Sequence, residues 1–200
     1  MFYNKAFKSD SQRLALSLRS SIAKRCSHLN AALALFGDKM SFTENDMKRQ
    51  MVLLQEIESQ SDRGTAIVGA AWVEEELKAA LKANLLDDEV VYKRLFQNGR
   101  LSDFSSCIDL SYMLKLVDKS QYQDLEKIRR IRNEFAHKLT DKNLEELSFN
   151  NASISDRCMQ LSCIQNEKIT DPRHAFCRAC AILYSEFYFL TIVPKIRYQP

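Results

Sequence analysis

Three residues of types that could take part in chemistry stand within six positions of one another in the segment RIRNEFAH, residues 130–137. They are Arg132, Asn133 and His137, and the whole chain has only three histidines. Such a group could be a catalytic cluster, or it could be the polar corner of a packed helix. The choice depends on the elements that hold the three side chains.

The sequence KSQYQDLEKIRRIRNEFAHKL, residues 119–139, predicts one helix that carries all three. At 100° per residue, Arg132 falls within the apolar stripe of this helix, whereas His137 lies about 140° further around, on the polar side. An inward arginine needs a carboxylate partner, and losing such a pair is expected to cost roughly 3 to 5 kcal/mol. The stripe consists of Leu125, Ile128, Phe135 and Leu139, and the candidate partners are Glu74, Glu75 and Asp62.

The composition predicts the fold class. The chain has 200 residues, 46% hydrophobic and 28% charged, which is enough to bury a substantial core. Only four glycines and three prolines are present, which favours helices joined by short loops. We therefore expect an all-α protein, a single bundle of about six to eight helices.

Two segments show helical signals that are independent of the Arg-Asn-His group. Residues 61–86 repeat small and apolar side chains at spacings of three and four, and Asp62 is placed to cap this predicted core helix. Residues 172–193 predict a last helix, with Asp171 as its N-cap and Pro172 in its first turn. The expected core positions of the first helix are Ala66, Ala70, Val73, Leu77, Ala80, Leu81 and Leu85.

Four cysteines near the C-terminus raise the question of a zinc site. CRAC has a C-x-x-C spacing and His174 is near, but the first cysteine pair is spaced C-x4-C, which matches a zinc site poorly. In the predicted last helix the CRAC cysteines lie on a buried face. We therefore expect reduced, buried thiols, with no metal and no cofactor. The four are Cys158, Cys163, Cys177 and Cys180.

Positive charge is concentrated near the N-terminus. The net charge is only +3, yet residues 1–30 hold six lysines and arginines against the single acid Asp10. We expect residues 1–43 to form a basic helical arm and residues 44–200 the main domain. Contact with nucleic acid or a protein partner is then predicted for Lys5, Lys8, Arg13, Arg19, Lys24 and Arg25.

No apolar run reaches the length of about 18 to 20 residues that a membrane-spanning helix requires. The longest candidate, AILYSEFYFLTIV, is shorter and contains Glu186. The N-terminus also lacks the apolar centre of a signal peptide. We expect a cytoplasmic protein without a membrane partner.

Three segments in fixed order resemble the MltR (mannitol operon repressor) family of bacterial regulators. They are SDRGTAIVGAAWVEEELKAAL, then LSDFSSCIDLSYMLKLVDKSQYQDLEKIRRIRNEFAH, then DPRHAFCRACAILY. The resemblance covers about residues 58–193 and leaves the first 55 residues outside. It implies a compact all-helical protein of a family of transcriptional regulators that has no recognisable DNA-reading helix-turn-helix.

A shorter resemblance concerns the Arg-Asn-His group itself. Arg132-Asn133-x-x-x-His137 fits the R-x4-6-H motif of HEPN (higher eukaryote and prokaryote nucleotide-binding) domains, helical bundles that often act as dimeric RNases. This resemblance implies that His137 acts on a ribose 2′-hydroxyl, Arg132 stabilises charge on the phosphate and Asn133 orients, without a metal.

The favoured interpretation is an MltR-like regulator that acts through macromolecular contacts, possible as a homodimer, and that is not an enzyme. A metal-independent RNase of the HEPN type is the alternative. A non-catalytic interaction or accessory module is the third hypothesis. In the favoured interpretation the Arg-Asn-His group is structural, with Arg132 holding two helices together and His137 in the last turn, near the negative end of the helix dipole.

Overall fold

The computed structural model describes residues 52, 55–97, 99, 101–138, 140 and 146–194. This part of the chain is an all-α bundle, as the composition predicts, and it contains no strand, only an isolated bridge between Thr140 and Glu146. Its elements are α3 (Asp62–Ala83), α4 (Glu89–Tyr92), the π-helix η1 (Lys93–Gln97), α5 (Phe104–Met113), α6 (Lys119–His137), α7 (Ala152–Met159), the 3-10 helix η2 (Ser162–Ile164) and α8 (Pro172–Ile192).

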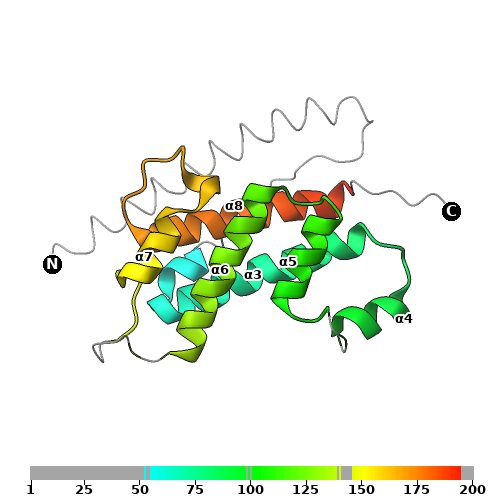
Figure 1. The fold of residues 1–200 in the computed structure, drawn as a ribbon, viewed down its shortest axis with the longest axis horizontal. Helices are drawn as coiled ribbons and strands as arrows, with labels where there is room; N and C mark the ends of the chain where they lie inside the picture. Colours follow the sequence, from blue (N-terminus) through cyan, green and yellow to red (C-terminus); the bar gives the residue numbers. More distant parts are fainter. Residues whose placement is uncertain are drawn as a thin grey trace. The chain divides into compact units, whose positions relative to one another are not determined.

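Helices α3 and α8 form the central pair and make the most extensive contact in the bundle (Figure 1). The predicted N-cap of α8 is confirmed, since the Asp171 carboxylate accepts a 2.7 Å hydrogen bond from the backbone N–H of His174. The predicted cap of α3 is wrong by one residue, because the Ser61 hydroxyl caps this helix. The carboxylate of Asp62 is therefore used elsewhere.

A glycine lets the central helices approach closely. A Cβ added at Gly69 would lie 3.1 Å from a ring carbon of Phe176 and 3.4 Å from the sulfur of Cys180, both on α8. Any larger residue at this position would push against α8. The small residues of α3 thus have the role that the sequence suggests, and they fix how near α8 can lie.

Helices α5 and α6 lie across the central pair (Figure 1). Asp103 caps α5, and hydrogen bonds from the hydroxyl of Ser105 and from Ser106 lower the pKa of its carboxyl to about 2. Asp118 and Gln121 form a complete capping box at the start of α6. Both helix starts are therefore determined by local polar residues.

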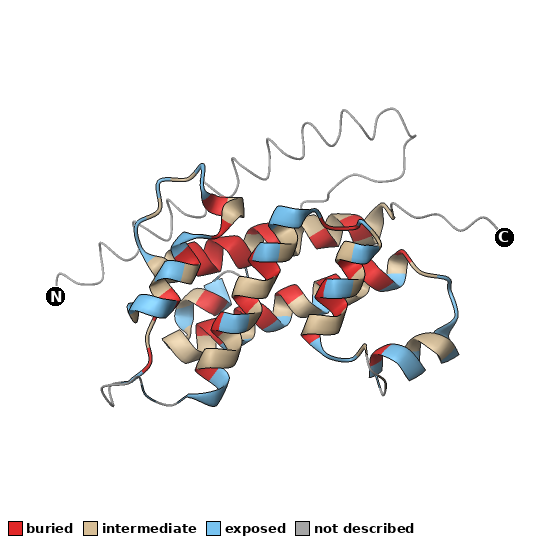
Figure 2. Ribbon diagram, viewed as in Figure 1, coloured by how far each residue is buried: buried red, intermediate tan, exposed pale blue. Residues whose placement is uncertain are grey.

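The core lies where the inner faces of α3, α5, α6 and α8 meet, and Figure 2 colours the buried residues of these helices red. Six of the seven core positions predicted on α3 are fully buried, and Leu85 is partly buried. Of the stripe predicted on α6, Leu125, Ile128 and Phe135 are fully buried, while Leu139 lies outside the described residues.

The 3-10 helix η2 is attached to α6 by a buried acid. The two carboxylate oxygens of Asp124, only 1% exposed, accept hydrogen bonds of 2.8 and 2.9 Å from the backbone N–H groups of Ser162 and Cys163. The ammonium of Lys127 lies 3.2 Å from the same carboxylate. Asp124 therefore connects two segments that are almost forty residues apart.

Helix α8 is long enough and apolar enough to cross a membrane. The sequence pattern does not indicate this, because polar residues interrupt its apolar run. Most of this helix is buried inside the bundle, where it packs against α3. Core helices of soluble proteins share this character. The arm predicted at residues 1–43, with its six basic residues, lies outside the described residues.

Candidate functional site

The guanidinium of Arg132 is bound on both sides. Its Nη2 donates a 3.1 Å hydrogen bond to Oε2 of Glu74 on α3, and its Nη1 donates a 3.0 Å bond to Oδ1 of the neighbouring Asn133. Glu74 also accepts a 2.7 Å bond from Lys78 one turn along α3. The ion pair expected for Arg132 is thus confirmed, and Glu74 is the partner among the three candidates.

Arg132 is less buried than its position in the apolar stripe predicts. Its side chain is 31% exposed and that of Glu74 is 15% exposed. The long arginine side chain reaches from the core edge to the surface between α3 and α6, so that solvent screens the pair. The expected cost of 3 to 5 kcal/mol on losing this pair must therefore be corrected to about 1 kcal/mol.

His137 lies on the solvent face of the last turn of α6 and is exposed. Within the described part of the chain, its imidazole makes no hydrogen bond or ion pair. The Arg132 guanidinium bonds to the adjacent Asn133, whereas His137 lies about 140° around the helix from Arg132, as the helical geometry predicts. No hydrogen bond among the described residues joins His137 to Arg132 or Asn133.

Sequence reasoning missed a residue that caps this end of α6. The guanidinium of Arg63 on α3 donates to the backbone carbonyls of Phe135 and Lys138, two of the acceptors that the end of a helix leaves open. A cation placed there also offsets the negative end of the helix dipole. The only sequence signal is the presence of an arginine in the first turn of α3.

Glu134 binds two cations on the outer side of the same turn. Its carboxylate accepts from Lys138 at 2.7 Å and from Arg157 of α7 at 2.5 Å. Burial would raise the pKa of Glu134, but these two hydrogen-bonded cations hold it below the ordinary glutamate value. The charges around the RNEFAH segment therefore connect α6 to α7 as well as to α3.

The DPR segment at the start of α8 has a structural role. Arg173 pairs with Asp62 at 2.9 Å, and its other nitrogen donates to the hydroxyl of Thr65 at 3.0 Å. The second oxygen of Asp62 accepts a 3.0 Å bond from the backbone N–H of Phe149. This cluster joins the starts of α3 and α8 to the loop before α7.

The cysteines expected to be buried thiols are confirmed as such for the CRAC pair and Cys158, and Cys163 is partly buried. Burial raises the pKa of Cys158 and of Cys177 to about 12. Thiols of this kind are poor nucleophiles and poor metal ligands near neutral pH, because both roles need the thiolate.

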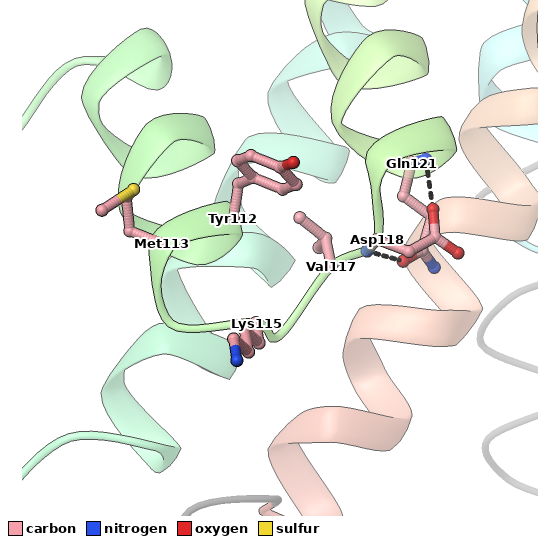
Figure 3. Close-up of a pocket in the computed structure, with 6 residues that line it drawn as sticks. All are labelled: Tyr112, Met113, Lys115, Val117, Asp118 and Gln121. Atoms are coloured by element: carbon pink, nitrogen blue, oxygen red, sulfur yellow. Dashed lines mark hydrogen bonds between the residues drawn. The ribbon is translucent and has the colours of Figure 1, made fainter.

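A surface hollow lies where α5 turns into α6, and we call it the α5–α6 corner (Figure 3). Its volume is about 720 Å³, and it is lined by Tyr112, Met113, Lys115, Val117, Asp118 and Gln121.

The end of α5 at this corner has an unusual backbone. The N–H of Leu116 bonds to the carbonyl of Ser111 and that of Lys115 to the carbonyl of Tyr112, both at 2.9 Å, which is a Schellman motif. Glycine usually occupies the left-handed position of this motif, but here it is Lys115, with φ of 57°. Nothing in the sequence indicated this corner.

Comparison with known proteins shows which known fold the chain shares. No protein-family model matches the chain, and no curated protein is significantly similar to it. Among solved structures, the X-ray structure of the MtlR–HPr complex from Escherichia coli is similar, with a TM-score of 0.55 and 18% identity. The match covers 70% of this chain and 98% of the other.

This chain shares the fold of MtlR. Because the match includes almost the whole of the other chain, the likeness concerns the complete architecture and not a common helix pair. The likeness inferred from the three sequence segments is therefore supported at the level of the fold. MtlR was solved in a complex with the protein HPr.

Proposed function

We propose that this chain is a regulatory protein that acts through contact with another protein. The observation that carries the proposal is the fold shared with MtlR over 98% of that chain, in a structure where MtlR binds HPr. The sequence resemblance to MltR regulators supports the same conclusion. More specifically, we propose that the protein controls transcription. It would do so by binding a partner protein and not by reading DNA with a helix-turn-helix.

A structural role for the Arg-Asn-His group supports this proposal over an RNase. Arg132 is held by Glu74 and Asn133, so its guanidinium would have to leave an existing ion pair to bind a phosphate. His137 is on a different face, so a phosphate bound by Arg132 would not lie beside its imidazole. We therefore propose a non-catalytic protein in which this group holds α6 in place.

The first test measures partner binding directly. The full chain is immobilised and incubated with HPr from the same organism and, separately, with a cell extract, and each captured protein is then purified and titrated by calorimetry. We expect one protein to bind in a defined stoichiometry, with HPr as the first candidate. Absence of any saturable protein partner in both experiments would contradict the proposed function.

The second test separates the structural role from catalysis. The parent chain, Arg132→Ala and His137→Ala are incubated with RNA in the presence of a metal chelator, and the products are analysed for 2′,3′-cyclic phosphate ends. We expect no cleavage by any of the three. Cleavage by the parent that both variants lose would establish the RNase alternative instead.

The basic N-terminal arm is proposed as a second contact surface, for an anionic partner or nucleic acid. Deleting residues 1–30 should weaken such binding and reduce its dependence on salt, because fewer cations would release counterions. Titrations of the full and shortened chains at several salt concentrations measure both effects. Equal affinity and equal salt dependence would assign the arm to packing.

A further inference from the structure

We propose that the α5–α6 corner is a docking site for an acidic segment of a partner protein, a segment that also inserts an apolar side chain. This inference rests on the proposed function, since it names the surface that a protein partner would contact. The corner combines two exposed lysines that form no ion pair with a described residue and an exposed apolar side chain, Met113.

The positive charge is the first observation. Most lysines and arginines of the described helices form ion pairs, as Arg132 does with Glu74 and Lys127 with Asp124. Lys115 and Lys119 are both exposed, and no carboxylate of the described residues lies within ion-pair distance of either. Two neighbouring cations without an internal partner attract an acidic segment and orient it on approach.

The ammonium of Lys119 is held at the edge of the corner by aromatic rings. It lies 5.1 Å from the centre of the Tyr112 ring and 4.9 Å from that of Tyr122. The two rings are 4.8 Å apart, and the hydroxyl of Tyr122 donates to Asp109 at 3.1 Å. A cation placed over two rings is positioned before a partner arrives, so less entropy is lost on binding.

Apolar surface at the corner is the second observation. The side chain of Met113 is 76% exposed at the end of α5. It belongs to the lining of the hollow, and it points away from Tyr112 and Val117 (Figure 3). Methionine is flexible and polarisable, so it adapts to different apolar partners. A leucine or phenylalanine from the partner could remove this methionine from water.

The third observation is the backbone conformation of Lys115. Its φ of 57° is a left-handed conformation, which glycine adopts without cost and lysine does not. Lys115 stands on the turn after α5, where it is one of the residues that line the hollow (Figure 3). The strain is observed at the same residue that carries the unpaired charge, as is common at binding surfaces.

The acidic groups facing the corner are engaged in bonds of their own. Asp118 accepts from the backbone N–H of Gln121 at 2.9 Å and from the hydroxyl of Ser120 at 2.8 Å, because it caps α6. Glu186 of α8 accepts a 2.8 Å bond from the side chain of Gln121. These bonds orient the two carboxylates, which stay charged. Neither carboxylate lies within ion-pair distance of Lys115 or Lys119, whose exposed ammonium groups therefore remain accessible to an acidic partner.

A protein segment fits the corner better than a nucleic acid does. Nucleic-acid binding needs a row of cations along the phosphates, and the corner offers only two. The exposed apolar side chain of Met113 would have no partner on a phosphate backbone. An acidic and apolar peptide satisfies both features at once.

The test uses the full chain with a defined probe. A fluorescent peptide in which aspartates and glutamates flank leucine and phenylalanine is titrated by anisotropy, beside its asparagine and glutamine counterpart and a single-stranded RNA of similar length. The double variant Lys115→Glu, Lys119→Glu is compared with Arg94→Glu, Lys168→Glu, which changes the net charge equally at two exposed cations far from the corner in sequence. Circular dichroism melts check that both variants fold.

We expect the acidic peptide to bind at least about tenfold more tightly than its amide counterpart, and the corner variant to lose at least about tenfold in affinity. The control variant should stay within about twofold of the parent. Met113→Asp should weaken binding by a similar factor while leaving the lysines in place. Equal losses in the corner and control variants, or no binding of the acidic peptide, would overturn the inference.

The remaining outcomes separate this inference from the proposed function. Tighter binding of the RNA than of the peptide, lost in the corner variant, would reassign the corner to nucleic acid and overturn the inference. A captured partner that binds the parent and the corner variant equally would overturn the inference and leave the proposed function standing. Peptide binding at the corner without any captured partner would support the inference and contradict the proposed function.

Discussion

The two ends of α6 differ in how their charges are satisfied. At the C-terminal end, Arg132 is paired with α3, Glu134 is paired with α7, and Arg63 caps the open carbonyls. At the N-terminal end, Lys115 and Lys119 have no carboxylate partner among the described residues, and Met113 is exposed. Charged residues at one end hold the bundle together, whereas those at the other end are available to a partner.

This difference shows that residue types alone do not identify a functional surface. The RNEFAH segment contains the residues typical of catalysis, yet Arg132, Asn133 and Glu134 already bind within the fold, and of its polar residues only His137 is exposed without a described partner. The α5–α6 corner contains no residue typical of catalysis, yet it has the unpaired charge and the exposed apolar side chain. What a polar residue can do depends on whether the fold has already used its hydrogen bonds.

The largest expected effect comes from the core side of the RNEFAH segment. Phe135→Ala should destabilise the protein by about 3 to 5 kcal/mol, because this fully buried ring contacts Phe149 with centroids 5.0 Å apart. Urea unfolding followed by circular dichroism measures the change. Met113→Ala at the corner is the control and should cost less than about 0.5 kcal/mol. Similar losses for both would remove the contrast between the two ends of α6.

Removing the Arg63 side chain, which caps the end of α6 from α3, should have the next largest effect on stability. Arg63→Ala leaves the carbonyls of Phe135 and Lys138 without this donor, and we expect a loss of about 1 to 2 kcal/mol. Arg94→Ala, an exposed arginine without an ion-pair partner in the described region, should change stability by less than about 0.5 kcal/mol. Hydrogen exchange should also show faster opening of the last turn of α6 in Arg63→Ala alone.

The Arg-Asn-His group should respond unequally to substitution. Arg132→Ala should cost about 1 kcal/mol, because the pair with Glu74 is partly exposed and screened by solvent. His137→Ala should cost less than about 0.5 kcal/mol, because its exposed side chain has no described partner. The loss in the free energy of unfolding caused by Arg132→Ala should become smaller at high salt. A loss of several kcal/mol that does not depend on salt would show instead that the pair is buried.

The smallest effect should be a gain at the corner. Lys115→Gly relieves the left-handed backbone and should stabilise the protein by about 0.5 kcal/mol, after the greater entropy of glycine in the unfolded chain is counted. Lys115→Ala keeps the strain and should give no gain. Thermal melts of the two variants measure the difference. Destabilisation by Lys115→Gly would show that the lysine side chain supports the fold, against its proposed role in binding.

Much of the fold followed from the sequence because helix signals are local. The repeat of apolar residues along α3 and α6, the Asp171 and Pro172 start of α8 and the scarcity of glycine and proline all act within a few residues. The sequence pattern places the N-cap of α3 at Asp62 instead of Ser61. Serine and aspartate suit an N-cap equally well, so local signals cannot separate the two positions. Only the contact with Arg173 on α8 shows why Asp62 is used elsewhere.

The sequence by itself determined the three long helices α3, α6 and α8, that Arg132 must point towards a carboxylate and that His137 must face another way. The tertiary structure decided that Glu74 is that carboxylate, that Arg63 closes the end of α6 and that two lysines at the corner have no described carboxylate partner. The physical reason is range: helix periodicity and capping act between neighbours, whereas Arg132 and Glu74 are 58 residues apart along the chain. Such pairs exist only once the packing of α3 against α6 has brought them together.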